Sequence, residues 1–222
     1  MEDFITTLYI TFKLAILTTI FLLLIGLPLA YILSFKKPPF KTLWESIITV
    51  PLVLPPTVLG FYLLILFSSD SFIGKLINRI FNTEILFTFK GILIASIIYS
   101  LPFMVQPIQN GFKSLNKSLI EASYTLGKSE IETLFKVLIP NIKVSILTAI
   151  ILTFAHTVGE FGVVLMVGGG IPGETLVASI SIYNEVEALN YSTAHKYAFI
   201  LLLISFISIL SVNFLANKFS KE

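Results

Sequence analysis

Residues 14–33 have the sequence LAILTTIFLLLIGLPLAYIL, which contains no Asp, Glu, Lys or Arg. About 20 apolar residues in a helix cross the roughly 30 Å hydrocarbon core of a bilayer, so this stretch predicts a membrane-spanning helix. The composition of the whole chain agrees, because 55% of its 222 residues are hydrophobic and only 13% are charged. A soluble domain has roughly 25% charged residues. The chain is therefore predicted to be an integral membrane protein.

Four further apolar stretches predict an all-α polytopic protein with five spans. The approximate spans are residues 10–34, 46–67, 90–110, 143–167 and 196–217. Pro51, Pro55 and Pro56 interrupt the second span. Because proline removes a backbone donor, we expect a kinked helix that packs against other protein. The fourth span contains one carboxylate, Glu160.

The basic residues predict the orientation, since loops on the cytoplasmic side retain Lys and Arg. Ten of the fifteen basic residues follow the first, third or fifth span: Lys36, Lys37, Lys41, Lys113, Lys117, Lys128, Lys136, Lys143, Lys218 and Lys221. Acidic residues begin the chain and follow the fourth span. We therefore expect the N-terminus outside and the C-terminus inside.

Two segments outside the spans are more than simple connections. Apolar residues recur with helical spacing over residues 72–81, while Lys75 and Arg79 fall on the other face, which predicts a short helix in the outer interface. Residues 176–191 are too polar to span a membrane. Both a re-entrant segment and a lid over an outer vestibule fit their sequence.

The basic loop at residues 113–143 has the signals of a helix-turn-helix. Two capping boxes follow each other in it, formed by Ser118 with Glu121 and by Ser129 with Glu132. Gly127 between them predicts a left-handed helix end, and Pro140 predicts a stop or restart before the fourth span. The alternative is a folded loop that only connects two spans.

This loop resembles the EAA motif of ABC importer permeases, which is Glu-Ala-Ala, three residues, Gly, nine residues, and Ile-x-Leu-Pro. Here Glu121-Ala122-Ser123 is followed at the same spacing by Gly127 and by Val137-Leu138-Ile139-Pro140. The departures are Ser for Ala, Val for Ile and Ile for Leu. The resemblance implies a coupling helix that docks into a separate ATPase subunit. The coupling residues that it implies are Glu121, Ala122, Ser123, Gly127 and Pro140.

A second resemblance covers the end of the fourth span and the turn after it. Gly159-Glu160-Phe161-Gly162, then Gly168 to Thr175 with the sequence GGGIPGET, and then Ile182-Tyr183 resemble the molybdate and tungstate permeases. Their pattern is GEFG, a short apolar stretch, GNIPGxT and a following Ile-Tyr. Sulfate permeases are similar but usually have Tyr after the Glu. This chain departs from the pattern with Gly170 for Asn and His156 for Arg.

The fourth span and its turn contain the candidate residues of a translocation pathway or gate. These are His156, Gly159, Glu160, Phe161, Gly162, Gly168, Gly169, Gly170, Pro172, Gly173 and Thr175. A carboxylate within the membrane is costly unless it is paired, hydrated or protonated, and His156, four residues before Glu160, is a candidate partner. A role in gating and a role in helix packing alone both fit Glu160. The glycines fit a tight turn, or a backbone nest that meets a passing oxyanion.

The remaining sequence features limit the function. The chain has no Cys and two His, which predicts neither a metal site nor a cysteine nucleophile, and the net charge of +2 does not indicate a nucleic-acid partner. Glu174 occupies the Lys position of a near-match to the phosphate-binding loop, so we expect no nucleotide site, no catalytic residues and no enzyme activity on this chain.

The resemblances imply the type I ABC importer permease fold in a prokaryotic plasma membrane, and import of a tetrahedral oxyanion by alternating access. One coupling loop per chain predicts a homodimer, since ABC ATPases act as pairs. The implied partners are two cytoplasmic ATPase subunits, which bind ATP and Mg, an extracytoplasmic oxyanion-binding protein and membrane lipid. The alternatives are a sulfate or thiosulfate ABC permease and an ATP-independent secondary transporter or channel.

Overall fold

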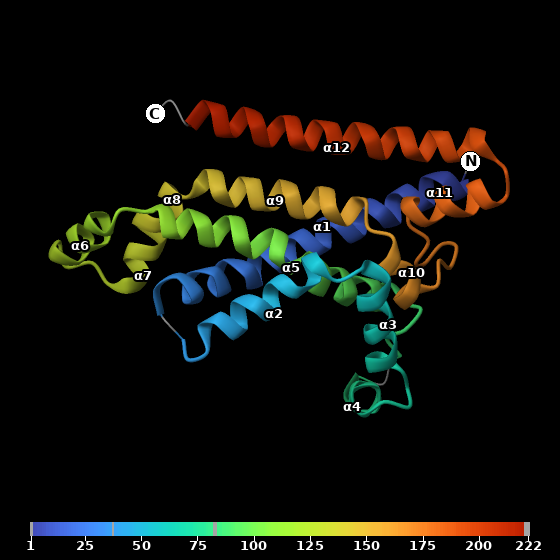
Figure 1. Cartoon of the computed structure of the whole chain (residues 1–222), viewed down its shortest axis with the longest axis horizontal. Helices are drawn as coiled ribbons and strands as arrows, with labels where there is room; N and C mark the ends of the chain where they lie inside the picture. Colours follow the sequence, from blue (N-terminus) through green and yellow to red (C-terminus); the bar gives the residue numbers. More distant parts are fainter. Residues whose placement is uncertain (1, 37, 82–83, 220–222) are drawn as a thin grey trace.

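The computed structural model describes residues 2–36, 38–81 and 84–219, and every regular element in these ranges is a helix. Five helices lie along the long axis: α1 (Glu2–Tyr31), α2 (Lys41–Val53), α5 (Phe89–Ser114), α9 (Lys143–Val158) and α12 (Tyr191–Phe219) (Figure 1). The N-terminus and the C-terminus lie at opposite ends of this axis, as an odd number of crossings requires (Figure 1). The prediction of an all-helical fold is confirmed for the described residues.

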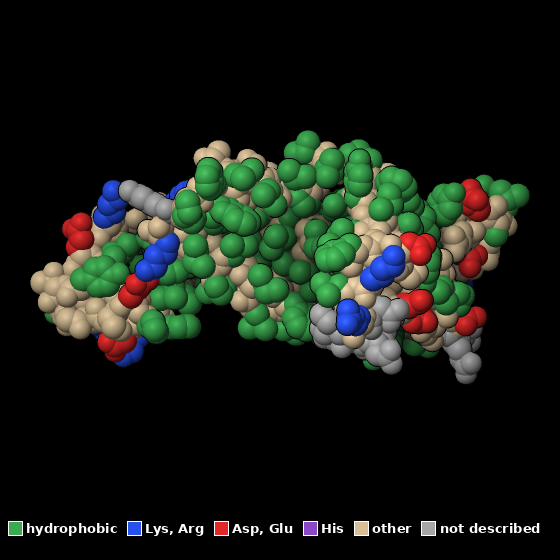
Figure 2. Space-filling view, turned by 90° about the horizontal axis from the view of Figure 1, so that it is seen from below, with side chains coloured by type: hydrophobic (Ala, Val, Ile, Leu, Met, Phe, Trp, Pro, Cys, Tyr) green, Lys and Arg blue, Asp and Glu red, His purple; other side chains and the backbone are tan. Residues whose placement is uncertain are grey.

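The shorter helices gather at the two ends of the molecule (Figure 1). The end near the C-terminus, called the inner end below, contains α6 (Lys117–Thr125), α7 (Glu130–Thr133), η2 (Leu134–Leu138) and α8 (Ile139–Asn141), and η1 (Ile32–Lys36) ends α1 there. The other end, called the outer end, contains α3 (Pro56–Phe67), α4 (Phe72–Phe81), α10 (Gly162–Gly168) and α11 (Ala178–Glu187). Figure 2 shows hydrophobic side chains across the middle of one face and charged side chains toward both ends.

The number of candidate spans depends on how the bent helices are counted. Among the described residues, three helices are long and apolar enough to cross a membrane alone, and five spans result if each of two bent pairs counts as one. The pair α2 and α3 bends by 114°, so the prediction of one kinked helix over residues 46–67 is wrong. Leu54 has an extended backbone with ψ 136° because it precedes Pro55, and Pro56 begins a new helix.

The predicted fourth span, residues 143–167, also consists of two helices. Helix α9 ends at Val158 with Gly159 as its C-cap, and α10 begins at Gly162. Glu160 therefore lies between two helices and not on a helical face that continues from His156. The non-helical backbone of residues 159–161 therefore lies at the outer end of α9 (Figure 1).

Helices α1, α5 and α9 form the centre of the molecule. Leu22, Met104, Ile108, Phe112 and Ala149 from these three helices are fully buried in one hydrophobic cluster. Helix α12 lies on the outside, where Leu202, Phe206 and many other apolar side chains are exposed, as expected for a lipid-facing helix (Figure 1).

The two segments between spans both contain helices. Residues 72–81 form α4, which confirms the predicted short helix, and its Phe72 and Leu76 are exposed. Residues 176–191 contain α11, which packs against α12 and α1 at the outer end. The hydroxyl of Thr11 on α1 accepts a hydrogen bond of 2.9 Å from the backbone amide of Ala178.

Candidate functional site

Backbone hydrogen bonds stabilise the turn between α6 and α7. Gly127 has a φ of +75°, the left-handed conformation that the sequence predicts, and its N–H donates to the carbonyl of Tyr124 at 2.9 Å. The N–H of Lys128 donates to the carbonyl of Ser123 at 3.2 Å. The hydroxyl of Ser123 lies 2.8 Å from that of Thr133, and both are buried. Ser123, where the EAA pattern has Ala, thus links the two helices.

One of the two predicted capping boxes is present. Ser129 and Glu132 form the reciprocal pair of bonds at the start of α7, as predicted. The box predicted at Ser118 and Glu121 is wrong, because the N-cap of α6 is Asn116, whose side chain accepts from the N–H of Ser118 at 3.1 Å. An Asn two residues earlier caps the helix equally well and places Ser118 inside it.

Exposed apolar side chains cluster on this helix pair, outside the apolar middle of the molecule. Leu126 is 77% exposed, Ile131 71% and Phe135 62%, and Tyr124 is also exposed. An exposed apolar patch of this kind is typical of a protein-binding surface. Glu121 and Ala122 are exposed on the same pair of helices.

Helix α7 is bonded to the end of α1. The carboxylate of Glu130 accepts from the hydroxyl of Tyr31 at 2.6 Å and from the ammonium of Lys36 at 2.7 Å. The hydrogen bonds from Lys36 and Tyr31 hold the pKa of Glu130 below its usual value. Hydrogen bonds from Lys136 and from the Ser129 backbone do the same for the pKa of Glu132. The two bonds of Glu130 join α7 to the inner end of α1.

Pro140 lies in the short helix α8, between the π-helical turn η2 and α9. The axis bends by 72° between the segment Glu130–Asn141 and α9. Proline at the first turn of a helix leaves no backbone donor unpaired, so Pro140 is compatible with the start of a new helix here. Of the five predicted coupling residues, four lie on α6 or in the turn after it, and Pro140 lies at the connection to the membrane helix.

At the outer end, the break between α9 and α10 faces the break between α2 and α3 across an open cavity of about 420 Å³. Its lining residues are Pro56, Thr57, Tyr99, Ala155, His156, Gly159, Glu160, Phe161 and Gly162. The contact between α10 and α3 is close, since a Cβ on Gly162 would lie 3.0 Å from Cβ of Pro56. The structure thus brings together five of the predicted pathway residues.

Glu160 is 3% exposed, and within the described part of the chain neither of its carboxylate oxygens has a hydrogen-bond partner. The hydroxyl of Ser96, fully buried, approaches the carboxylate without reaching hydrogen-bond geometry. The pairing with His156 expected from the sequence is wrong. His156 Nδ1 lies 3.0 Å from the Ser100 hydroxyl, and its ring stacks on Phe103 with centroids 3.9 Å apart.

The glycine-rich turn lies outside this cavity. Thr175 is fully buried, and its hydroxyl donates to the carbonyl of Gly168 at 2.6 Å and accepts from the N–H of Ile171 at 2.8 Å. Gly169, Gly170 and Gly173 have positive φ, and Pro172 is exposed. This geometry is that of a tight turn closed by Thr175. The Ile171 amide is used within the turn and does not point to a ligand.

Comparisons with known proteins agree with this architecture. A family model described as the binding-protein-dependent transport system inner membrane component matches residues 22–221. The chain is 43% identical over 93% of its length, and 91% of the relative's, to the molybdenum transport system permease protein ModB of Azotobacter vinelandii. It is 30% identical over 96% of its length, and 76% of the relative's, to the sulfate transport system permease protein CysT of Salmonella typhimurium.

The fold also matches a solved structure. A chain of the MetNI methionine ABC transporter in an inward-facing conformation has a TM-score of 0.71 with 18% sequence identity, and 97% of each chain is covered. Because the family model covers most of the chain and ModB is similar over nearly its whole length, this chain belongs to the inner membrane components of binding-protein-dependent transport systems, the permease subunits of ABC importers.

Proposed function

We propose that this permease imports molybdate or tungstate, with a separate ATPase as the source of energy. The observation that carries the proposal is the 43% identity to ModB over nearly the whole length of both chains, compared with 30% to the sulfate permease. The GEFG sequence at residues 159–162 supports it, since all four of these residues line the outer cavity at the α9–α10 break.

The inner helix pair is the proposed docking surface for the ATPase. Exposed apolar side chains lie on this pair and on the adjoining η2, namely Leu126, Ile131 and Phe135. Glu130 bonds this pair to Tyr31 and Lys36 at the end of α1. Movement of the docked helices therefore reaches a membrane helix through contacts that have defined geometry.

The chain acts as a homodimer in this proposal. It offers one docking surface, whereas ABC ATPases close on ATP as pairs, and two surfaces are needed. The anion path then runs along the two-fold axis. ATP binding moves the docked helices together, the inner side closes and the outer side accepts the anion from an extracytoplasmic binding protein. The catalytic site, with ATP and Mg, lies on the ATPase.

The outer cavity is the proposed gate region. Two helix breaks meet there, at residues 54–56 and at residues 159–161. Irregular backbone at membrane depth is tolerated where it lines a cavity or is buried in protein, which is the situation of transporter sites. Because Glu160 is buried and its carboxylate has no hydrogen-bond partner among the described residues, its proposed role is in the gate and not in direct contact with a dianion.

The test is uptake by proteoliposomes that contain the permease, its ATPase and the binding protein. We expect ATP-driven uptake of tungstate and molybdate, with sulfate taken up at least tenfold more slowly at equal concentration. Faster uptake of sulfate would favour the sulfate or thiosulfate permease. Uptake at an equal rate without ATP would favour a secondary transporter or channel and contradict the proposal.

A further inference from the structure

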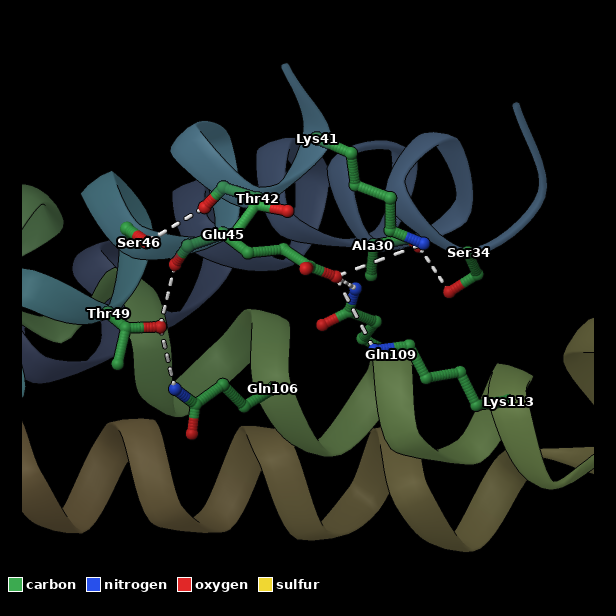
Figure 3. A network of polar contacts seen from close by, with 10 residues as sticks. All are labelled: Ala30, Ser34, Lys41, Thr42, Glu45, Ser46, Thr49, Gln106, Gln109 and Lys113. Atoms are coloured by element: carbon green, nitrogen blue, oxygen red, sulfur yellow. Dashed lines mark hydrogen bonds and ion pairs between the residues drawn. The ribbon is translucent and has the colours of Figure 1, made fainter. Parts of the chain in front are cut away.

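Polar side chains of α2 and α5 face one another in the inner half of the molecule. On α2 they recur at helical spacing: Thr42, Glu45, Ser46 and Thr49. On α5 they are Gln106, Gln109 and Lys113. Figure 3 shows Glu45 and Thr49 pointing toward the three α5 side chains, while Thr42 and Ser46 lie on the neighbouring, exposed side of α2. We call these seven residues, together with Lys41 at the start of α2, the polar seam.

Glu45 is the centre of the seam. Its Oε1 atom accepts a 2.7 Å hydrogen bond from Nε2 of Gln109, and it lies 3.4 Å from Nζ of Lys113 and 3.9 Å from Nζ of Lys41 (Figure 3). One turn further along, Nε2 of Gln106 donates to the hydroxyl of Thr49 at 3.2 Å. Three donors, two of them cationic, thus converge on one carboxylate oxygen.

The seam borders two open spaces. A cavity of about 190 Å³ lies between α2 and α5, with Leu33, Val105 and Asn110 beside the polar residues. A second space of about 580 Å³ lies along the face of α2 that carries Thr42, Ser46 and Val53. Glu45 and Thr49 line both. Room is therefore present next to the donors on two sides.

In the first turns of α2 the two sides differ in chemistry, whereas further along Val50, Val53 and Leu54 continue the side that carries Thr42 and Ser46. Leu43, Trp44 and Ile47 are each more than half exposed and fit contact with lipid or an apolar partner. Thr42 and Ser46 are exposed on the other side, next to the half-buried carboxylate of Glu45. Polar and charged side chains of a membrane helix face a water-filled cavity or one another, because contact with lipid is costly. The seam is therefore expected to be in contact with water.

The donors of the seam also match an oxyanion. Two ammonium groups and two amide NH₂ groups can bind a tetrahedral dianion through hydrogen bonds, whereas the hydroxyls of Ser46 and Thr49 donate to backbone carbonyls of α2. In the described structure, the carboxylate of Glu45 occupies the central donors of this set. A passing anion would compete with that carboxylate for the same donors.

We propose that the polar seam is the inner exit of the anion path, and that Glu45 promotes release by taking back the donors that the anion uses. The inference rests on the proposed function and deepens it. The anion approaches Lys41, Lys113 and Gln109 as the inner side opens. The carboxylate then returns to these donors and repels the anion toward the cytoplasm, so the anion does not remain bound at the exit.

The first test uses the absence of cysteine from the chain. Ser46→Cys places a thiol in the seam, and the matched control Ile47→Cys places one on the apolar side of the same helix turn. The assembled transporter in nucleotide-free vesicles is exposed on the cytoplasmic side to an impermeant, anionic methanethiosulfonate. We expect Ser46→Cys to react at least tenfold faster than Ile47→Cys, and tungstate to slow its reaction.

Equal, slow labelling at both positions would overturn the proposal, since the seam would then be covered by protein and closed to water. The result is separable from the proposed function, because labelling requires no transport. If the unsubstituted transporter showed no ATP-driven tungstate uptake, the result would count against the proposed function alone. Thr49→Cys, deeper in the seam, provides a second position if Ser46→Cys does not assemble.

The second test is Glu45→Gln, with Glu187→Gln on the outer surface of α11 as the matched control. The neutral amide no longer competes for the two lysines. We expect tungstate to bind five- to tenfold more tightly to the nucleotide-free transporter in nanodiscs, without the binding protein, and uptake to turn over more slowly. Unchanged or weaker tungstate binding by Glu45→Gln would contradict the role of Glu45 in release.

Discussion

The carboxylates at the inner end of this permease and the carboxylate at its outer cavity have opposite environments. Glu45, Glu130 and Glu132 at the inner end each accept hydrogen bonds from cationic or polar side chains and are partly open to water. Glu160 at the outer cavity is buried, and within the described residues it has no partner. Exchangeable ionic contacts therefore belong to the inner end, whereas the outer carboxylate is buried beside a cavity that is lined by both polar and apolar groups.

This difference indicates where movement is least costly. Ion pairs at partly exposed positions contribute little, typically about 0–1 kcal/mol, so they exchange partners readily. The outer cavity is bounded by contacts such as that of Gly162 with Pro56, which leave no space for displacement without repacking. The predictions that follow test the two regions, from the largest expected effect to the smallest.

Gly127→Pro is expected to disrupt the turn between α6 and α7 and to abolish ATP-driven uptake. Proline fixes φ near about −65°, whereas Gly127 has +75°, and it removes the N–H that donates to the Tyr124 carbonyl. The protein should still reach the membrane, because the five membrane helices are unaffected. The measurement is tungstate uptake by reconstituted vesicles with equal amounts of permease.

The matched control is Gly127→Ala, whose Cβ would meet no atom within 4 Å and which keeps the hydrogen bond. It carries only the strain of a left-handed alanine, about 1 kcal/mol. We expect it to retain most of the uptake. Full uptake by the proline variant would refute the coupling role of this turn.

Local signals in the sequence predicted the elements whose geometry is set by nearby residues. Gly127 adopts the left-handed conformation because only glycine does so without strain, and Ser129 caps α7 with Glu132 three residues away. The chain ends lie at opposite ends of the molecule, as an odd number of crossings requires (Figure 1), and the orientation from basic residues stays a prediction; of those residues, Lys37 and Lys221 lie outside the described ranges.

Contacts between distant residues could not be predicted from one sequence. Glu130 and Tyr31 are 99 positions apart, and Glu45 and Lys113 are 68 apart, so neither pair has a local signal. The helical spacing of Gln106, Gln109 and Lys113 was a visible signal for the polar seam. At Pro55 and Pro56 the signal for a break was present, but the length of the apolar stretch favoured one helix.

Gly162→Val is expected to disturb the outer cavity with a smaller effect than the proline at the inner end. A Cβ at this position would lie 3.0 Å from Cβ of Pro56 and 3.2 Å from the backbone N of Thr57, so two more methyl groups force α10 away from α3. Overpacking of this kind costs typically about 1–3 kcal/mol. We expect a lower thermal midpoint and roughly tenfold slower uptake, since the cavity changes shape.

Gly162→Ala should give an intermediate effect, because its single methyl requires a shift of only a few tenths of an ångström. If the valine variant matched the unsubstituted protein in uptake and thermal stability, the result would contradict a tight contact between these helices. A graded series would confirm that α10 and α3 are in close contact beside the outer cavity.

Glu130→Gln tests the link between α7 and α1. The amide retains an acceptor for Tyr31 but loses the charge that pairs with Lys36. We expect a two- to fivefold loss of uptake per ATP hydrolysed, measured as the ratio of the two rates, with ATP hydrolysis itself nearly unchanged. Glu132→Gln, whose ion pair with Lys136 lies within the loop, is the control and should leave the ratio nearer to that of the unsubstituted protein.

The pH dependence of this link has a definite sign. Because the pKa of Glu130 is lowered in the folded state, its pairing is fully present above the usual value of 4.5 and is lost only as the pH falls through the lower, folded value. Uptake per ATP should therefore not depend on Glu130 titration between about pH 6 and 8. If uptake per ATP fell near pH 6.5 in the unsubstituted protein but not in Glu130→Gln, the result would contradict this assignment.

Glu160→Gln is expected to have the smallest effect on the folded protein and gives the sharpest contrast with Glu45→Gln. The amide has nearly the volume of the carboxyl group and cannot ionise, so it avoids the cost of an unpaired buried charge. Since the substitution breaks no hydrogen bond among the described residues, we expect an unchanged or higher thermal midpoint and uptake within about twofold. Glu160→Ala empties the same space and should lower the midpoint through the cavity that it leaves. If Glu160→Gln lowered the midpoint as much as Glu160→Ala does, the carboxylate would have an ionic partner in the assembled transporter. The two ends of the molecule would then be alike in their electrostatics.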